Sequence, residues 1–329
     1  MRTTLGAALA LAMSLGATGA IAQDKTVTFV HQDMIVPFRT LIDSGKLEEA
    51  TGYKINWQKI AGGGDVIRAM ASGDAQIGEV GSSPATAAAS QGIDVQVFWI
   101  LDDIANAEQL VAHNDSGVST IADLKGKKVG VPFVSTTHYH LLAALEDAGL
   151  SSGDVEVLNM APPAVAAAWE RGDIDATFIW DPVLSKVKEN GTVLISSGDI
   201  AKKGKPTFDA IMVDRTWASE NKDFMVALVK MLAETDEAYR SNAAAYTADS
   251  AEVTAIAKVS GADPAMVPNA LGAYRFLTLE EQASAEWLGG GVAKAMADTA
   301  LFLKEQGRIT EVAPDYSKFV TDEFVKAAM

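Results

Sequence analysis

The chain of 329 residues contains no cysteine. This absence excludes disulfide bonds, thiolate nucleophiles and cysteine-ligated zinc or iron–sulfur sites, so a hydrophobic core must stabilise the fold. Histidine is almost as scarce, with four residues, and none of them falls into a recognised metal-binding spacing. The Gly-x-Ser-x-Gly elbow of hydrolases and the Gly-Lys-Ser/Thr phosphate loop are missing as well. The sequence therefore predicts no catalytic residues, no metal and no organic cofactor.

Basic residues are also in short supply, with 27 lysines and arginines against 43 acidic residues and a formal net charge of −16. A nucleic-acid-binding surface needs a basic patch to offset the phosphates. The densest basic group is Lys202, Lys203 and Lys205, which we expect to lie in a solvated loop. Nucleic acid is therefore excluded as a partner.

Apolar runs are short, and only the N-terminal one resembles a targeting segment. Leu5 to Leu15 follows the basic Arg2 and is too short to span a bilayer comfortably. Ala20-Ile21-Ala22 then supplies small residues at the two positions that a signal peptidase reads. A buried N-terminal helix is the alternative, but it leaves this tripeptide unexplained. We expect residues 1–22 to be a cleaved signal peptide and the mature protein to be soluble in the periplasm.

Short strand-like runs alternate with helical segments from residue 26 to about 213. Val27 to Val30 and Tyr53 to Ile60 are strand candidates, and a second series begins near Gly126. Alternation of this kind is typical of βαβ units and a mainly parallel sheet. The segments 69–77 and 168–176 also resemble each other, which suggests two similar α/β lobes.

The sequence after Val213 is expected to be helical throughout. Phe224 to Tyr246, Val253 to Val259 and Leu279 to Gln306 have helical patterns, with no strands between them. Such helices are best used to cover a lobe that is already formed. We therefore predict a discontinuous first lobe made of residues 23–111 and 212–329, with residues 112–211 inserted as the second lobe.

Hydroxyl side chains follow two predicted strands, each time at the point where a helix starts. Ser82-Ser83-Pro84 and Ser135-Thr136-Thr137-His138 are the two segments. Unpaired N–H groups and the helix dipole make a helix N-terminus suitable for an anion. Ordinary capping explains either segment alone, since serine and threonine are preferred N-caps. Two such turns, one per lobe, favour an anion bound between the lobes.

Carboxylates and aromatic side chains supply a second set of candidates. Asp102, Asp103 and Glu108 surround the connection after the Val95 to Leu101 strand, and Asp209 lies near the predicted return crossing. One of these carboxylates could hold a cation, although surface solvation is the favoured interpretation of Asp102 and Asp103 taken singly. Trp180 and Tyr139 could wall a pocket, and a Trp face also suits an ammonium group, but either could equally lie in the core.

Four stretches together resemble the periplasmic taurine-binding proteins of ABC importers, and the similarity covers nearly the whole mature chain. The stretches are Ala71-Ser72-Gly73-Asp74-Ala75-Gln76-Ile77-Gly78, Gly81-Ser82-Ser83-Pro84, Val131 to Tyr139, and Ala168-Trp169-Glu170-Arg171-Gly172-Asp173-Ile174-Asp175. The segment Ser135-Thr136-Thr137-His138-Tyr139 is the specific part, because alkanesulfonate and nitrate binders differ there. The resemblance implies a type II periplasmic binding protein fold, in which two α/β lobes with mainly parallel sheets close on a ligand.

The resemblance also implies roles for particular residues and partners. It places the sulfonate of taurine against Ser82, Ser83, Ser135, Thr136, Thr137 and His138. It places the ammonium group against Glu108 and Asp209, with Gln32 and Trp180 lining the pocket. The expected partners are the small ligand and an ABC permease with its cytoplasmic ATPase, and the protein is expected to be a monomer.

Two alternatives stay open at this stage. Asp181 in Trp180-Asp181-Pro182 resembles the alkanesulfonate binders, and Asp102-Asp103 adds acid near the expected ammonium end, so another alkanesulfonate or aminosulfonate is possible. The fold also resembles pyrimidine-precursor synthases, which are cytoplasmic enzymes with a reactive histidine and cysteine-containing motifs. The signal sequence and the lack of cysteine argue against that enzyme class.

Overall fold

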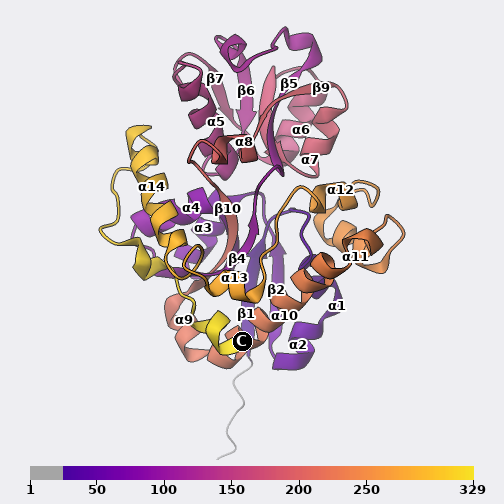
Figure 1. Ribbon diagram of the computed structural model, residues 1–329, viewed down its shortest axis with the longest axis vertical. Coiled ribbons are helices and arrows are strands. Elements are labelled where there is room, and N and C mark those ends of the chain that lie inside the picture. The colour runs from indigo at the N-terminus through magenta and orange to yellow at the C-terminus, as the bar shows by residue number, and fades with distance from the viewer. Residues whose placement is uncertain (1–24) are drawn as a thin grey trace, which may run out of the picture.

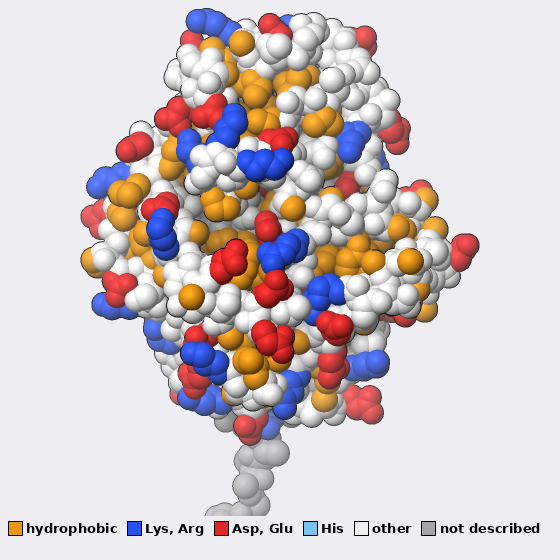
Figure 2. All heavy atoms as spheres, in the orientation of Figure 1, with side chains coloured by type: hydrophobic (Ala, Val, Ile, Leu, Met, Phe, Trp, Pro, Cys, Tyr) orange, Lys and Arg blue, Asp and Glu red, His pale blue; other side chains and the backbone are white. Residues whose placement is uncertain are grey.

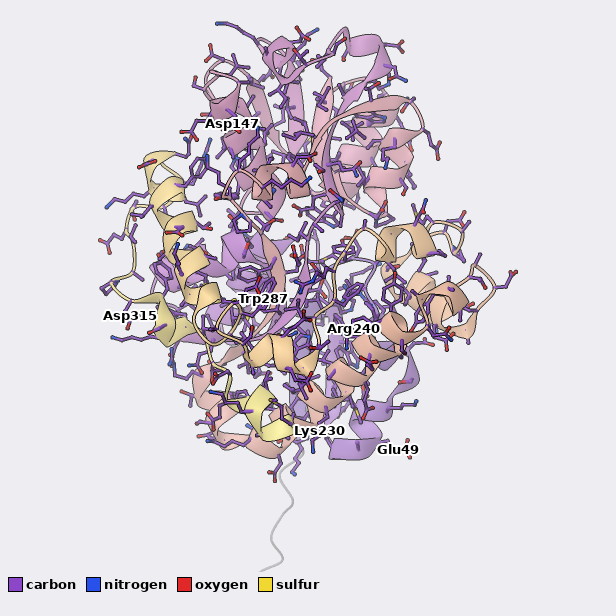
Figure 3. All side chains as sticks on the ribbon, in the orientation of Figure 1. Glu49, Asp147, Lys230, Arg240, Trp287 and Asp315 are labelled. Atoms are coloured by element: carbon purple, nitrogen blue, oxygen red, sulfur yellow. The ribbon has the colours of Figure 1, made fainter. Side chains whose placement is uncertain are left out.

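The computed structural model describes residues 25–329 and arranges them as two α/β lobes along the long axis of the molecule (Figure 1). The expected signal peptide, residues 1–22, and the start of the mature chain at Gln23 lie outside the described residues. Within the part that is described, no helix is long and apolar enough to cross a bilayer. Charged residues such as Glu49, Asp147 and Asp315 lie at the periphery, whereas Trp287 lies in the interior (Figure 3).

Lobe 1 is built on a five-stranded sheet in the order β2-β1-β3-β10-β4. Strand β1 pairs in parallel with β2 and β3, and β10 runs antiparallel to both β3 and β4. Every residue of β3 is buried, because helices cover both faces of this sheet. The strands are β1 (Thr26–His31), β2 (Lys54–Lys59), β3 (Ile77–Gly81), β4 (Val95–Asp103) and β10 (Phe208–Asp214).

Lobe 2 repeats this arrangement with the strand order β7-β6-β8-β5-β9. Strand β6 pairs in parallel with β7 and β8, and β5 runs antiparallel to β8 and β9. Both sheets are thus mixed, with one antiparallel strand in the fourth position of each. The strands are β5 (Glu108–His113), β6 (Lys128–Val131), β7 (Glu156–Asn159), β8 (Ala176–Trp180) and β9 (Gly191–Ser196).

The antiparallel strand of each lobe is the one that arrives from the other lobe. The chain leaves lobe 1 after β4 and enters the second sheet with β5, and it returns with β10. The expected lobe boundaries at 111/112 and 211/212 fall inside these two strands, so they need correction: the crossings are residues 104–107 and the segment before Phe208. Both predicted boundaries lie too far along the chain. The reason is that each crossing strand, β5 or β10, is as apolar as the strands of the lobe that the chain has just left.

Helices flank both sheets. In lobe 2 they are α5 (Thr136–Asp147), α6 (Pro162–Glu170), α7 (Val183–Lys188) and α8 (Ser197–Ala201), with 3-10 turns η1 (Asn114–Ser116) and η2 (Ile121–Leu124). The early helices of lobe 1 are α1 (Arg39–Ser44), α2 (Lys46–Thr51), α3 (Gly63–Ala71) and α4 (Ser82–Ser90). The late ones are α9 (Arg215–Glu220), α10 (Lys222–Ser241), η3 (Ala243–Ala245), α11 (Ala251–Ser260), α12 (Val267–Leu271), α13 (Leu279–Ala283), α14 (Gly291–Glu305), η4 (Tyr316–Phe319) and α15 (Glu323–Ala328).

The single helix predicted from Leu279 to Gln306 is wrong, because the chain turns between α13 and α14. At Gly289 a Cβ atom would lie 2.7 Å from the carbonyl oxygen of Ser284, and Gly290 has a φ of 148°. Only glycine fits such a tight, left-handed backbone. The turn directs α14 along the side of the molecule, where it reaches lobe 2 (Figure 1).

Helix α14 packs against both lobes. It contacts α4 of lobe 1, while its Phe302 and Leu303 lie in the apolar core of lobe 2. The ring of Tyr139 meets Phe302 edge to face with centroids 5.0 Å apart. Tyr139 is therefore a core residue of lobe 2 and does not wall the cleft, which settles one of the two interpretations left open for it.

Candidate functional site

A small cavity lies between the lobes, where strands β1, β3, β8 and β10 and the start of β5 end or begin. Its volume of about 10 Å³ is close to the room that one water molecule needs, so the two lobes are tightly closed on each other in this structure. A small solute would enter only when the lobes move apart, and its size is limited by how far they close again. The lining residues are Gln32, Met34, Gly63, Gly81, Pro84, Glu108, Ser135, Thr136, Trp180, Asp209 and Tyr274.

The strand ladders explain how distant residues meet in this cavity. Glu108 on β5 is directly opposite Trp180 on β8, and Asp209 on β10 is directly opposite Gly81 on β3. In each pair, one lining residue comes from the strand that arrives from the other lobe, β5 or β10. Its partner comes from a neighbouring strand of the same sheet, β8 or β3. The crossing strands therefore supply the acidic side chains of the cavity.

Three helices begin at the cavity. Helix α4 starts at Ser82 and α3 at Gly63, and neither has a side chain capping its first N–H groups. Helix α5 starts at Thr136, and the Ser135 hydroxyl accepts a hydrogen bond from the His138 N–H at 3.0 Å. Uncapped N–H groups at helix starts suit the oxygen atoms of an anion. The cavity thus has one side, formed by both lobes, whose chemistry suits an anion.

The starts of α4 and α5 approach each other closely. A Cβ atom on Gly81 would lie 2.8 Å from Thr136 Cγ2 and 3.2 Å from Asp209 Oδ1. Glycine is required here by this close approach, since its φ of −70° is open to any residue. The absence of a side chain at this position allows the two lobes to close.

The predicted anion-binding residues divide into two groups. Ser135 and Thr136 line the cavity, whereas the other four are buried beside it. Thr137 shares a hydrogen bond of 2.8 Å with the Ser135 hydroxyl, and Ser82 Oγ accepts from the Phe208 N–H at 3.4 Å. Ser83 is also buried and is not a lining residue.

His138 is a buried neighbour of the cavity. Its ring stacks on Phe133 with centroids 4.3 Å apart, and its Nε2 atom has no hydrogen-bond partner within the described chain. Burial, assisted by the charge of Arg308, lowers the pKa of His138 to about 4. A neutral imidazole at this place can donate a hydrogen bond without adding charge.

The other side of the cavity is acidic. Glu108 and Asp209 line it, and Asp102 lies behind them as the cross-strand neighbour of Asp209. Burial is the main cause that raises the pKa of Asp102 well above its ordinary value, followed by the charge of Asp209. Burial, with the nearby charge of Glu108, likewise raises the pKa of Asp209 well above its ordinary range. A single cation placed here would favour ionisation of a carboxylate beside it.

Solvation does not explain Asp102, which is buried with both oxygens unpartnered within the described residues. Asp103 is different, because its Oδ1 accepts a hydrogen bond from the Ala105 N–H at 3.3 Å and its carboxylate lies 3.8 Å from the Arg275 guanidinium.

Tyr274 was missed by the sequence analysis. Its buried hydroxyl has no partner in the described structure, and nearby carboxylates such as Asp102 add to the burial that raises its pKa well above 10.

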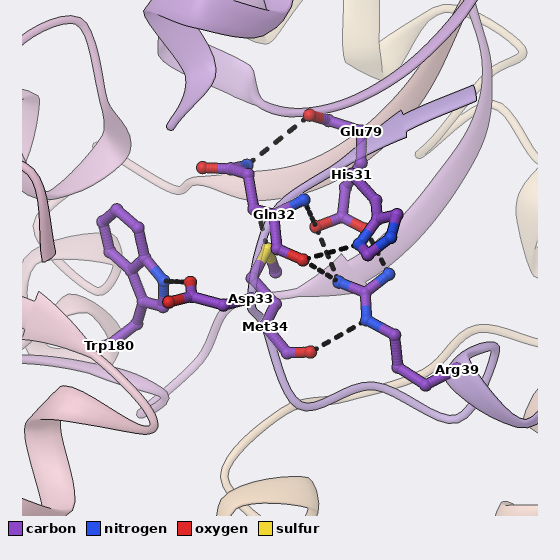
Figure 4. A network of polar contacts seen from close by, with 7 residues as sticks. All are labelled: His31, Gln32, Asp33, Met34, Arg39, Glu79 and Trp180. Carbon is purple, nitrogen blue, oxygen red and sulfur yellow. Dashed lines mark hydrogen bonds and ion pairs between the residues drawn. The ribbon is translucent and has the colours of Figure 1, made fainter. Parts of the chain in front are cut away.

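The loop that carries Gln32 is fixed by a buried ion pair (Figure 4). Arg39 and Glu79 are both fully buried, with Arg39 Nη1 and Glu79 Oε2 2.7 Å apart. Arg39 also donates to the carbonyl oxygens of Gln32 at 3.1 Å and Met34 at 3.0 Å. Charges this deep in the protein persist only when paired and hydrogen-bonded. The pair therefore serves to position two lining residues.

No metal centre comes together in residues 25–329, where no group of three histidine or carboxylate side chains is suitably placed. The surface facing the viewer in Figure 2 carries acidic and basic side chains interspersed, without a continuous basic area. The sequence analysis missed Met34, Gly63, Gly81, Pro84 and Tyr274. The glycine run 62–64 was the one available signal, since glycines before a helix often allow a ligand to approach the backbone.

Two α/β lobes joined by crossing strands and closed on a small polar cavity define the class, a two-lobed solute-binding protein with the type II periplasmic binding protein fold. The family described as NMT1/THI5 like matches residues 23–242. The chain belongs to this family.

Relatives and solved structures agree with this assignment. The chain is 38% identical to the taurine-binding periplasmic protein of Escherichia coli (strain K12), over 93% of this chain and 94% of that protein. The alkanesulfonate-binding protein from Xanthomonas axonopodis pv. citri, solved with bound MOPS, has the same fold with a TM-score of 0.70 and 23% identity, over 91% and 97% of the two chains. A desulfurization enzyme also has this fold, with a TM-score of 0.64 and 16% identity, over 92% and 98% of the two chains.

Proposed function

We propose that this protein binds taurine in the cleft between its lobes and delivers it to an ABC permease. The observation that carries the proposal is the composition of the cavity. Three helix starts and two buried carboxylates, Glu108 and Asp209, border one cavity between the lobes. A small zwitterion with an anionic and a cationic end needs both kinds of group in one cleft.

The sulfonate group would bind at the helix starts. Ser135 and Thr136 line the cavity there, and the first N–H groups of α3 and α4 have no capping side chain. The buried side chains beside the cavity would hold the turns in place; they are Thr137, Ser82 and Ser83. His138 Nε2, which has no partner among the described residues, is available as a donor.

The ammonium group would bind between Glu108 and Asp209, with the Tyr274 hydroxyl as a further acceptor. The face of Trp180 and the side chain of Gln32 would enclose the two-carbon spacer. Paired buried carboxylates are costly without a counter-charge, so the cationic end of the ligand supplies part of the binding energy.

Closure of the lobes would trap the ligand and create the surface that the permease recognises. The related proteins are periplasmic binding proteins, which supports the same compartment and a cleaved leader for this chain. We propose a monomeric carrier without catalytic activity. The chain shares its fold with a desulfurization enzyme but contains no cysteine to act as a nucleophile.

Calorimetric titration of the mature protein tests this proposal. Taurine should bind most tightly, 3-aminopropanesulfonate less so because its spacer is longer, and ethanesulfonate much more weakly because it has no ammonium group. Ethylamine, which lacks the sulfonate, should not bind measurably. Equal affinity for taurine and ethanesulfonate would show that the carboxylates do not recognise an amine, and the protein would then be a general alkanesulfonate carrier.

A further inference from the structure

Glu108 is connected to a buried histidine through one hydroxyl group. Glu108 Oε2 lies 3.1 Å from Ser197 Oγ, and Ser197 Oγ lies 2.8 Å from His140 Nδ1. His140 Nε2 lies 2.9 Å from the carbonyl oxygen of Lys205. Glu108, Ser197 and His140 are all buried, so water does not complete these contacts from the bulk solvent.

The contact with Lys205 fixes where His140 carries its hydrogen. A carbonyl oxygen only accepts hydrogen bonds, so the Nε2 atom that faces it must be the N–H donor. Burial lowers the pKa of His140 to about 4, which makes the ring neutral at physiological pH. A neutral ring protonated at Nε2 has a lone pair at Nδ1, and this lone pair points at Ser197.

Counting hydrogens then shows that this group needs one more. The Ser197 hydroxyl has a single hydrogen but lies between two acceptors, the Nδ1 lone pair of His140 and the Glu108 carboxylate. One hydrogen cannot fill both contacts, and an unfilled contact between two buried lone pairs is unfavourable. If Glu108 is protonated at Oε2, it donates to Ser197 while Ser197 donates to His140, and all contacts are filled.

We infer that Glu108 is a neutral carboxylic acid in the empty cleft, held so by His140 through Ser197, and that a cationic ligand must displace its proton. In that step the Oε2–H bond breaks and the proton passes to water or buffer. The Glu108 carboxylate then accepts a hydrogen bond from the N–H of the incoming cation. The second half of this inference rests on the proposed taurine function, whereas the first half concerns the ligand-free protein.

The surroundings support a protonated Glu108. Burial raises the pKa of Glu108 to about 7, although the hydrogen bonds that Thr136 and Ser197 donate to it act in the opposite direction. The other titratable groups that face it are Asp209 and Tyr274, and neither supplies positive charge. The charge of Lys205 also opposes protonation of the His140 ring.

His140 and Ser197 are thus positioning residues for ligand affinity, although neither lines the cavity. Below the pKa of Glu108, taurine binding should weaken by up to about tenfold per pH unit, because one proton must leave for each ligand bound. Ethanesulfonate has no cationic end, so its affinity should not show this dependence.

The ligand-free protein allows the first test. A carbon-13 NMR titration of the glutamate δ-carboxyl groups, with Glu108→Gln to assign the signal, should show Glu108 titrating near pH 7. In His140→Phe the Ser197 hydroxyl is free to donate to Glu108, so the midpoint should fall by at least one pH unit. His113→Phe changes a histidine outside this network and should leave the midpoint unchanged. A Glu108 midpoint in the ordinary carboxyl range overturns the inference, whether or not taurine binds.

The wild-type protein provides a test that needs no variant. Long-range proton–nitrogen NMR spectra should show His140 protonated at Nε2 and unprotonated at Nδ1 between pH 6 and 8. A hydrogen on Nδ1 over this range would overturn the inference, because Ser197 would then be free to donate to the Glu108 carboxylate.

Calorimetry in buffers of different ionisation enthalpy tests the ligand step. At pH 6, binding of taurine should release close to one proton, and at pH 8.5 it should release almost none. Binding of ethanesulfonate should release none at either pH. Taurine that binds at pH 6 without proton release would overturn the inference. A failure of taurine to bind, with Glu108 still titrating near pH 7, would instead remove the proposed function and the ligand step that rests on it, and would leave the first half of the inference standing.

Discussion

Trp180 of lobe 2 donates a hydrogen bond from its indole Nε1 to Asp33 Oδ1 of lobe 1, at 3.4 Å (Figure 4). This contact crosses the cleft directly, beside the ligand cavity that Trp180 lines. Asp33 is next to Gln32 and Met34, the residues whose carbonyl groups Arg39 holds in place. The closed state is therefore stabilised by a polar contact that an open state would lose.

Trp180→Phe removes this donor and keeps an aromatic ring in the cavity. We expect taurine affinity to fall about fivefold, which corresponds to the ~1 kcal/mol of one hydrogen bond. Small-angle scattering of the ligand-free protein should show a larger radius than for the wild type, because closure is less favourable. An unchanged affinity and radius would show that the contact does not contribute to closure.

Gly81→Ala tests whether lobe closure depends on the close approach at this position. The added methyl group would meet Thr136 Cγ2 at 2.8 Å, so the lobes could no longer close fully. We expect taurine affinity to fall by at least about tenfold, ~1.4 kcal/mol, and ligand-induced compaction to be lost. The melting temperature of the ligand-free protein should change little, since an open cleft relieves the contact with Thr136 and the end of the Asp209 side chain, 3.2 Å away within lobe 1, can shift. Gly153→Ala, where the nearest atom would be 3.6 Å away, is the matched control.

The buried ion pair predicts separate effects on stability and on binding. Arg39→Met leaves Glu79 charged and unpaired, which should cost about 3–5 kcal/mol of unfolding free energy. Adding Glu79→Gln should recover more than half of that loss in a denaturant titration. Taurine affinity should stay weakened in the double variant, because the carbonyl groups of Gln32 and Met34 still lack their donor. Full recovery of affinity would assign the pair a role in stability alone.

Asp236 on α10 predicts a pH-dependent stability. Both of its oxygens are buried without a partner in the described structure, and burial raises its pKa well above the ordinary value of 3.8. The folded state thus binds this proton more tightly than the unfolded state, and the resulting loss of stability grows as pH rises from about 4. Asp236→Asn should raise the melting temperature at pH 8 much more than at pH 4.5. The exposed neighbour Glu234→Gln should have no such effect, and equal shifts at both pH values would contradict this account.

Much of the fold was predictable because its signals are local. Alternating strands and helices, and hydroxyl residues at strand-to-helix turns, are read within about ten residues of sequence. The helix break before α14 was missed although Gly289-Gly290-Gly291 lies within the predicted helix, because the helical pattern on either side was followed through the glycines.

The acidic side of the cavity was only partly predictable. Glu108 and Asp209 were identified through a family resemblance, but Asp102 looked like a solvated surface residue. Its burial follows from pairing between β4 and β10, strands more than a hundred residues apart in the chain. Tyr274 comes from a loop after α12, and no local pattern indicates that such a loop reaches the cleft.

The most direct test of the central claim is calorimetry of wild type and Glu108→Gln with taurine and with ethanesulfonate, at pH 8. Glutamine keeps the size of the side chain but cannot balance a buried ammonium group. We expect Glu108→Gln to weaken taurine binding by about 2–4 kcal/mol and ethanesulfonate binding by far less. Equal losses for the two ligands would contradict the account, because Glu108 would then support the cleft without recognising the amine.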